Sequence, residues 1–114
     1  MTREEMMAFY ERQIEYYKND IAWCNMELER IKKELKKQRN DYNAAVERLW
    51  NNGVLTKSDM WWVNYGAENT NDYKKEVKWR TYIYKTRKRG MANLADYTRR
   101  LEKMKNNPND KYGF

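Results

Sequence analysis

A heptad repeat of apolar residues dominates the first half of the chain. One column, with members seven residues apart, consists of Met7, Ile14, Ile21, Leu28, Leu35, Tyr42 and Leu49. A second column, three residues after the first, consists of Tyr10, Tyr17, Cys24, Ile31, Gln38, Ala45 and Asn52. Alternating spacings of three and four residues are the a/d pattern of a coiled-coil seam. The pattern therefore predicts one long amphipathic helix over about residues 3–50.

Capping signals bound this predicted helix at both ends. Thr2 followed by Glu5 matches a capping box, in which a hydroxyl and an acidic side chain satisfy the first free amides. Gly53, in the run Asn51-Asn52-Gly53, can adopt the left-handed conformation that ends many helices. A helix of this length would measure roughly 70 Å. We therefore expect it to pack against another helix of the chain or against a second copy.

The first three heptads carry an additional apolar column. Phe9, Tyr16 and Trp23 occupy the c positions, and Met6 and Met26 lie beside them. The later heptads replace this column with Arg30, Lys37 and Ala44. We therefore expect residues 6–28 to be covered on two faces, by the rest of the chain or by a partner, and residues 29–48 mainly on one.

A tryptophan-rich connector is expected over residues 51–70. Thr56 with Asp59 forms a second capping-box pattern, which predicts a short helix at about residues 57–65. This helix would carry the adjacent pair Trp61 and Trp62. Gly66 then indicates a break, and residues 69–72 supply the cap of a new helix.

Residues 71–106 are predicted to form a second long helix that is rich in basic residues, with one alternative. A helical stripe is formed by Tyr73, Val77, Arg80, Tyr84 and Met91, and a second one by Met91, Leu94, Tyr97, Leu101 and Met104. Residues 77–83 also alternate between polar and β-branched or aromatic side chains, which favours a strand in a short β-hairpin within residues 60–86. Helix is preferred because residues 74–76, Lys-Lys-Glu, initiate helices well and no partner strand is convincing. Residues 107–114, with Pro108, form a tail.

These elements predict a single all-α domain, residues 1–114, in which the C-terminal helix returns antiparallel along the long N-terminal helix. A chain of 114 residues suits one domain. No apolar run approaches the ~20 residues needed to cross a bilayer, and the N-terminus lacks an apolar signal core. The expected location is therefore the cytoplasm, without membrane association. Cys24 is expected to be a small core residue in a reducing compartment.

Histidine and the common enzymatic motifs are missing from the sequence. There is no histidine, which removes the commonest general base and metal ligand. There is also no cysteine pair, glycine-rich phosphate loop or nucleophile elbow. We therefore expect a non-enzymatic protein without a cofactor or a metal.

Positive charge is concentrated in the C-terminal half. The net charge is +7, but residues 1–50 hold ten basic and ten acidic residues, whereas residues 69–105 hold twelve basic and four acidic ones. Residues 78–90 interleave these cations with aromatics, a pattern that neutralises phosphates and stacks on bases. The candidate nucleic-acid contacts are Lys78, Arg80, Tyr82, Lys85, Arg87, Lys88, Arg89, Arg99, Arg100 and Lys103. The alternative is a solvated basic face whose aromatics turn to the core.

Aromatic residues also give a candidate protein-binding surface, because exposed aromatics anchor many interfaces. These candidates are Phe9, Tyr16, Trp23, Trp61 and Trp62. The alternative is that they pack within the protein or within a homo-oligomer.

Three functional classes remain. The first is a helical interaction protein that blocks or adapts a partner protein or nucleoprotein. The second is a sequence-tolerant nucleic-acid-binding protein, and the third is a structural coiled-coil oligomer. Small size, no histidine and abundant Lys, Asn, Tyr and Trp resemble the composition of small phage and mobile-element proteins from AT-rich hosts, some of which are anti-CRISPR or other anti-defence inhibitors. The resemblance implies an inhibitor in the host cytoplasm and, being compositional, assigns no functional residue.

Overall fold

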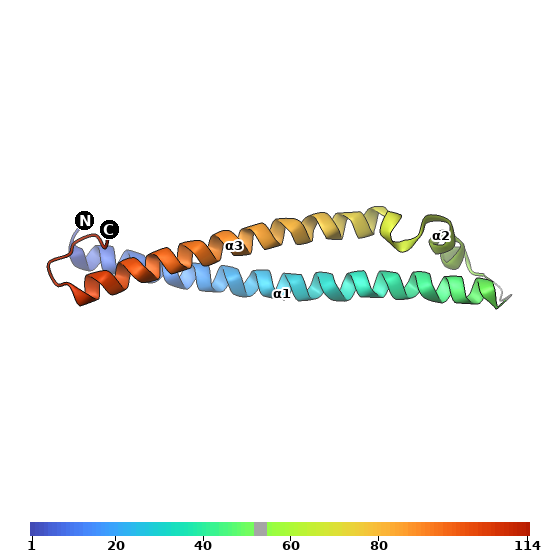
Figure 1. Cartoon of the computed structure of the whole chain (residues 1–114), viewed down its shortest axis with the longest axis horizontal. Helices are drawn as coiled ribbons and strands as arrows, with labels where there is room; N and C mark the ends of the chain where they lie inside the picture. Colours follow the sequence, from blue (N-terminus) through green and yellow to red (C-terminus); the bar gives the residue numbers. More distant parts are fainter. Residues whose placement is uncertain (52–54) are drawn as a thin grey trace. The chain divides into compact units, whose positions relative to one another are not determined.

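The protein is built from helices. The computed structural model describes residues 1–51 and 55–114, in which α1 spans Arg3–Trp50, α2 Lys57–Tyr65, the short 3₁₀ helix η1 Ala67–Asn69 and α3 Asn71–Asn106 (Figure 1). The predicted helices and their bounds are confirmed. The alternative of a β-hairpin within residues 60–86 is wrong, because α2, η1 and the first part of α3 occupy this region. The predicted helix stop at Asn52 and Gly53 lies outside the described residues.

Local caps explain where the helices begin. The hydroxyl of Thr2 accepts a hydrogen bond from the backbone N–H of Glu5 at 3.1 Å. Thr56 and Asp59 form the complete capping box at the start of α2. The hydroxyl of Thr70 accepts from the backbone N–H of the third residue of α3, Tyr73, at 3.1 Å. Each cap satisfies an amide that lacks a partner inside its helix.

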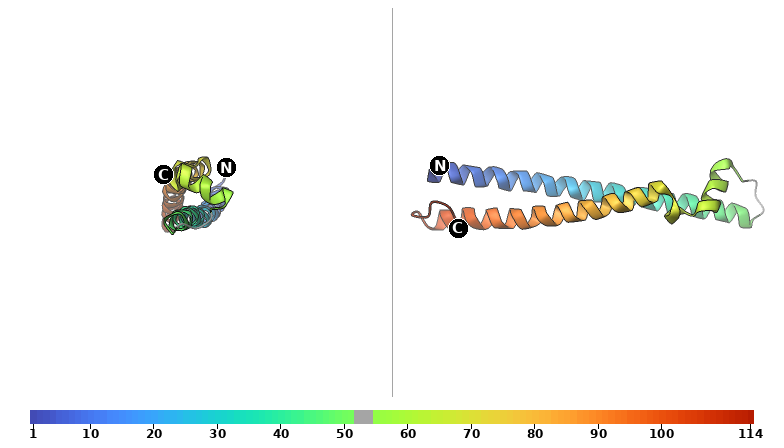
Figure 2. Two further views of the ribbon diagram at one scale, coloured as in Figure 1. Left: turned by 90° about the vertical axis from the view of Figure 1, so that its right-hand side faces the viewer. Right: turned by 90° about the horizontal axis from the view of Figure 1, so that it is seen from above.

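The chain forms two compact units, and both α1 and α3 contribute a segment to each. Unit 1 consists of residues 1–26 and 83–114, and unit 2 of residues 27–82. Within each unit the α1 and α3 segments run in opposite directions (Figure 2). The predicted antiparallel pairing of the N-terminal and C-terminal helices is therefore confirmed within each unit.

The core of unit 1 lies near the chain termini. It is centred on Tyr10, Leu101 and Met104, which are at most 7 % exposed. The partly buried residues packed against it are Met6, Met7, Phe9, Ile14 and Tyr97. The tail residues fold back onto this core, since the Tyr10 hydroxyl donates a hydrogen bond to the Tyr112 carbonyl. The C-terminal segment is thus part of unit 1.

A glycine allows close helix packing further along unit 1. Gly90 is buried in α3, and a Cβ atom at this position would lie 3.4 Å from Cγ1 of Ile21 on α1. Beside this contact Cys24 is fully buried, and burial, followed by the nearby Asp20 carboxylate, raises the pKa of its thiol. Cys24 is therefore the core residue that the heptad pattern predicted.

The core of unit 2 combines α1, α2, η1 and the start of α3. Its most buried members are Ile31, Leu35, Gln38, Ala45, Asp59, Ala67, Thr70 and Tyr73. The guanidinium of Arg39 donates to the hydroxyl of Tyr73, with Nη2 at 2.6 Å, and lies 5.7 Å from the centre of its ring. These contacts attach the first turn of α3 to α1 within the unit.

The heptad columns of α1 are largely confirmed. The d residues Tyr10, Cys24, Ile31, Gln38 and Ala45 are all buried. The a column is buried or half-buried except at its end, where Leu49 is 46 % exposed, so its predicted seam position is wrong.

The stripe predicted for the first part of α3 is partly wrong. Tyr84 and Met91 are 49 % and 55 % exposed. The face of α3 that is actually buried or half-buried follows a strict alternation of three and four residues: Tyr73, Glu76, Arg80, Ile83, Arg87, Gly90, Leu94, Tyr97, Leu101 and Met104. The stripe predicted for residues 91–106 already contains Leu94, Tyr97, Leu101 and Met104. Over residues 76–90 the repeat was not predicted, because two arginines, a glutamate and a glycine occupy four of its positions.

The start of α2 gives a testable pH dependence. Asp59 is 3 % exposed and accepts from Nε of Arg48 at 2.9 Å and from the backbone N–H of Thr56 at 3.1 Å. The Arg48 hydrogen bonds, followed by that from the Thr56 backbone, lower the pKa of Asp59 to about 2. The folded state favours the ionised carboxylate of Asp59. The carboxylate therefore contributes its full stabilisation at pH values above the ordinary pKa of an aspartate. This stabilisation is lost as the pH falls through the lower pKa that Asp59 has in the folded state.

We therefore expect the Asp59→Asn variant to unfold more easily than the wild type at neutral pH. The difference in unfolding free energy should be constant above about pH 5 and should shrink as the pH falls from about 4 to about 2. Urea denaturation of both proteins at several pH values measures this difference. A difference that stays the same down to about pH 2 would contradict the role of the carboxylate charge.

Candidate interaction surfaces

An aromatic face lies on the α1 segment of unit 1. Tyr16, Trp23 and Met26 are 60 %, 47 % and 73 % exposed. Tyr16 and Trp23 are seven residues apart and Met26 follows three later, so all three lie on one side of the helix. We call Tyr16, Trp23 and Met26 the α1 aromatic face. Of the two coverings expected for residues 6–28, the chain itself leaves these three side chains largely exposed, and covering by a partner stays a prediction.

Phe9, the first residue of the same column, has a different environment. It is half-buried against the core of unit 1 and contacts Tyr97 edge-on, with ring centroids 6.2 Å apart. Of the candidate protein contacts in unit 1, Phe9 therefore belongs mainly to the core, and Tyr16 and Trp23 belong to the surface.

Charged residues of both signs lie near the α1 aromatic face. Arg12 and Glu15 are exposed beside Tyr16. Asp20 is half-buried, and its carboxylate lies near Gly90 of α3 within unit 1. Asn19 lies between the two aromatic residues on the same side of the helix. The face thus has an apolar centre with polar and charged neighbours of both signs.

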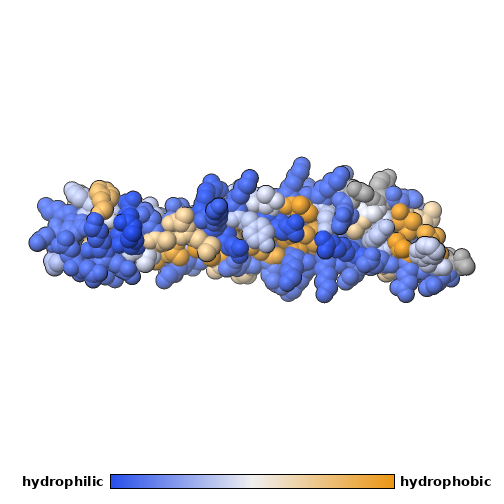
Figure 3. All heavy atoms as spheres, viewed as in Figure 1, coloured by the Kyte–Doolittle hydropathy of each residue, from blue (hydrophilic) through white to orange (hydrophobic). Residues whose placement is uncertain are grey.

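A second group of apolar side chains lies on α2 in unit 2. Met60 and Trp61 are 53 % and 41 % exposed, while Trp62 is half-buried. The two indoles contact each other edge to face at 4.7 Å. Figure 3 shows one face of the molecule, on which groups of hydrophobic residues interrupt a mostly hydrophilic surface.

The candidate nucleic-acid contacts in unit 1 divide into two groups. The exposed ones are Lys85, Lys88, Arg89, Arg99 and Lys103. The half-buried ones, Arg87 and Arg100, contact other residues of the unit. Arg87 donates to Oδ1 of Asn25 at 2.9 Å, and Arg100 pairs with Asp96 at 3.0 Å. The basic stretch is therefore not one continuous free surface.

Asp96 offsets part of this charge. It accepts a hydrogen bond from Arg99 at 2.8 Å in addition to the pair with Arg100. The Arg99 hydrogen bond is the main cause that lowers the pKa of Asp96, so this carboxylate stays ionised at neutral pH. Lys85, Lys88 and Arg89 are left as the most concentrated exposed cations of unit 1.

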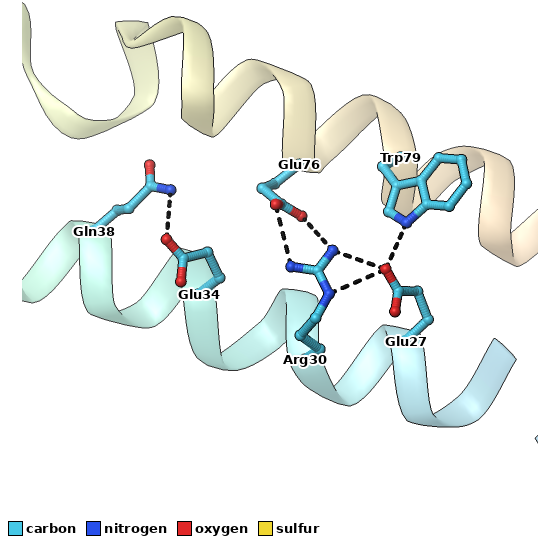
Figure 4. A network of polar contacts seen from close by, with 6 residues as sticks. All are labelled: Glu27, Arg30, Glu34, Gln38, Glu76 and Trp79. Carbon is cyan, nitrogen blue, oxygen red and sulfur yellow. Dashed lines mark hydrogen bonds and ion pairs between the residues drawn. The ribbon is translucent and has the colours of Figure 1, made fainter. Parts of the chain in front are cut away.

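A polar network connects α1 and α3 within unit 2 (Figure 4). The guanidinium of Arg30 donates to Oε1 of Glu27 at 2.8 Å and to Oε2 of Glu76 at 3.1 Å. The indole N–H of Trp79 donates to the same oxygen of Glu27 at 2.8 Å. The Arg30 and Trp79 hydrogen bonds, in that order, lower the pKa of Glu27. The network therefore fixes the side chain of Trp79 on the surface of α3.

The fixed indole supports a second aromatic ring. Trp79 and Tyr82 stack with centroids 5.1 Å apart and planes inclined by 18°, and the two residues are 38 % and 50 % exposed. They line a groove of about 600 Å³ with Arg30, Lys75, Glu76 and Lys78. We call this the Trp79–Tyr82 groove.

The Trp79–Tyr82 groove contains two of the sequence-predicted contacts, Lys78 and Tyr82. A third, Arg80, is half-buried on the seam side of α3 and does not line it. Sequence reasoning did not select Trp79, Lys75 or Arg30. The spacing of three residues between Trp79 and Tyr82 was a usable signal, because it brings two aromatics together on a helix.

Other kinds of site receive no support from the described residues. Residues 1–51 and 55–114 contain no group of three or more His, Cys, Asp or Glu side chains arranged to hold a metal ion. None of the helices in these ranges is long and apolar enough to cross a membrane. No family model matches the chain, and no curated protein or solved structure shows detectable similarity to it.

Proposed function

We propose that the protein is a non-enzymatic helical interaction protein that binds a partner protein or nucleoprotein through the α1 aromatic face. The observation that carries the proposal is the exposure of Tyr16, Trp23 and Met26 on one side of a helix. Large apolar side chains grouped on a surface mark interaction sites, and tyrosine and tryptophan are enriched among the residues that contribute most to binding. Their helical spacing suits a partner helix.

The compositional resemblance to phage and mobile-element proteins gives the proposal its first partner class. An inhibitor or adaptor of that kind would act on a host defence complex, such as a CRISPR nucleoprotein. Binding by helix packing requires no catalytic group, which fits a sequence that lacks histidine and phosphate-binding loops.

A matched pair of double variants tests the proposal. We expect the Tyr16→Ala/Trp23→Ala protein to lose its partner, because truncating anchor aromatics costs about 2 kcal/mol or more, roughly 30-fold in Kd. The control is Tyr84→Ala/Met91→Ala, which removes side chains of comparable exposure from α3 of the same unit. Affinity enrichment from host cells, followed by titration of the identified partner, gives the comparison. Equal partner binding by the two variants, with native circular dichroism, would rule the α1 aromatic face out.

Self-association is measured in the same experiment. The structural-oligomer alternative expects a stable homo-oligomer by light scattering and no other partner. If the wild type is an oligomer that the Tyr16→Ala/Trp23→Ala variant dissociates, the occupant of the α1 aromatic face is a second copy of the chain. A wild-type monomer that captures a partner excludes this alternative.

A further inference from the structure

The Trp79–Tyr82 groove lies in unit 2 and is not used by the proposed protein contact, whose α1 aromatic face belongs to unit 1. It contains the half-exposed ring of Tyr82, which is stacked on the indole of Trp79 in nearly parallel orientation. A flat ring held in this way is a surface on which another flat ring can stack. The first requirement for the ligand is therefore a planar, polarisable group.

The tyrosine ring is positioned before any ligand arrives. The indole of Trp79 is held by the Glu27 carboxylate, and Glu27 is held in turn by Arg30, which also pairs with Glu76 (Figure 4). Because Tyr82 stacks on this fixed indole, its ring loses less freedom when a ligand binds than an isolated surface tyrosine would. Preorganisation of this kind increases affinity by reducing the entropy lost on binding.

Lysines give the groove its charge. Lys75 and Lys78, both exposed, line the Trp79–Tyr82 groove. The same two lysines also line a second groove of about 600 Å³ around the start of α3, together with Glu68, Asn71, Tyr73, Lys74 and Val77. The two grooves therefore adjoin at Lys75 and Lys78. The second requirement for the ligand is negative charge repeated along a chain that can pass both lysines.

We propose that the Trp79–Tyr82 groove binds single-stranded nucleic acid without sequence preference. One base stacks on Tyr82, and the neighbouring phosphates lie at Lys78 and Lys75. Sequence-tolerant single-strand binding combines these two elements, since every base has a flat face and every nucleotide a phosphate. A duplex fits less well because its bases are already stacked on both sides. An acidic peptide would satisfy the lysines but would leave the aromatic stack without a function.

The proposal is tested by fluorescence anisotropy with the full chain and labelled strands of about 15 nucleotides, a length that covers one such site. Poly-dU, poly-rU and a duplex of equal length serve as probes, and a polyglutamate peptide serves as competitor. We expect both single strands to bind more tightly than the duplex and polyglutamate to compete poorly. The stronger of the two single strands then identifies the sugar.

Substitutions at Tyr82 separate stacking from charge. We expect Tyr82→Ala to weaken single-strand binding by about 5- to 150-fold, because a base–aromatic stack contributes about 1–3 kcal/mol. Tyr82→Phe keeps the ring and should bind like the wild type. Tyr84→Ala removes a tyrosine of nearly equal exposure outside the groove and should also bind like the wild type. Lys78→Gln should reduce the slope of log affinity against log salt by about 0.7.

Three results would overturn the proposal: no single-strand binding at low salt, equal binding by Tyr82→Ala and wild type, or displacement by polyglutamate as effective as by an unlabelled strand. Equal affinity for duplex and single strands would also contradict it, because that pattern indicates general attraction to the basic side of α3. Tyr16→Ala distinguishes this site from the proposed protein contact. It should weaken partner capture and leave oligonucleotide binding unchanged, so each proposal can fail without the other.

Discussion

Replacing Met104 with alanine is expected to lower the free energy of unfolding by about 2–5 kcal/mol, because the substitution leaves a cavity in a packed core. Met104 is fully buried in unit 1 and belongs to the cluster formed with Tyr10 and Leu101. Its carbonyl also accepts a hydrogen bond from the Arg3 guanidinium, so the backbone around the cavity is tied to the start of α1. The neighbouring side chains therefore have little freedom to collapse into the space.

Met91→Ala is the matched control for this prediction. Met91 lies on the same helix and in the same unit but is 55 % exposed, so its truncation should change stability by less than about 0.5 kcal/mol. Chemical denaturation followed by circular dichroism compares the two variants, and amide hydrogen exchange over residues 83–106 localises the effect. Similar losses for both methionines would mean that the buried face of α3 is assigned incorrectly.

The two methionines also show where the sequence pattern was sufficient and where it was not. α1 could be predicted because apolar residues fill nearly every position of its seam. The seam of α3 could be predicted over residues 94–104 but not over residues 76–90, because Arg80, Arg87 and Gly90 occupy positions where the a/d pattern calls for apolar residues. Arg87 is accommodated there by its hydrogen bond to Asn25, and Gly90 by its close approach to Ile21. These reasons depend on the residues of the facing helix, which periodicity within one segment does not reveal.

The candidate surfaces were predictable to a similar extent. Residue types identified Tyr16, Trp23 and Tyr82 as functional candidates, but not which of them would be exposed. A second apolar column on a helix predicts contact with the rest of the chain or with a partner. Only the folded chain shows that no other part of unit 1 fully covers Tyr16 and Trp23. Trp79 went unselected because its place in the groove depends on Glu27, which lies 52 residues away in the sequence.

The same limitation applies to charge. The basic residues of the stretch 78–90 are close in the sequence but do not share one surface. On a helix they point in several directions, so Lys78 lines a groove of unit 2, whereas Arg87 lies in the seam of unit 1. A count of positive charges therefore overestimates the surface that can contact a phosphate chain.

A buried polar residue in unit 2 gives the second large prediction. Gln38 occupies a d position of the α1 seam, is 7 % exposed, and donates from Nε2 to Oε1 of Glu34 at 3.2 Å. Its side-chain oxygen Oε1 is buried and has no hydrogen-bond partner among the described residues. A buried acceptor without a partner costs about 1–3 kcal/mol, because it has lost water and gained nothing. Leucine is the residue that coiled-coil d positions favour.

We therefore expect Gln38→Leu to raise the free energy of unfolding by about 1–2 kcal/mol, since the relief of the unpaired oxygen exceeds the loss of one hydrogen bond to the half-buried Glu34. Gln38→Glu should act in the opposite direction and by about 2 kcal/mol or more, because it places a second carboxylate beside Glu34 in a buried position. Lys37→Leu controls for the general effect of adding leucine to this helix and should change stability by less than about 0.5 kcal/mol, since Lys37 is exposed.

Urea denaturation of the wild type and the three variants gives the order of their stabilities. A Gln38→Leu protein less stable than the wild type would show that the glutamine stabilises the seam, for example by fixing the register of α1 against α3 within unit 2, as polar seam residues do in coiled coils.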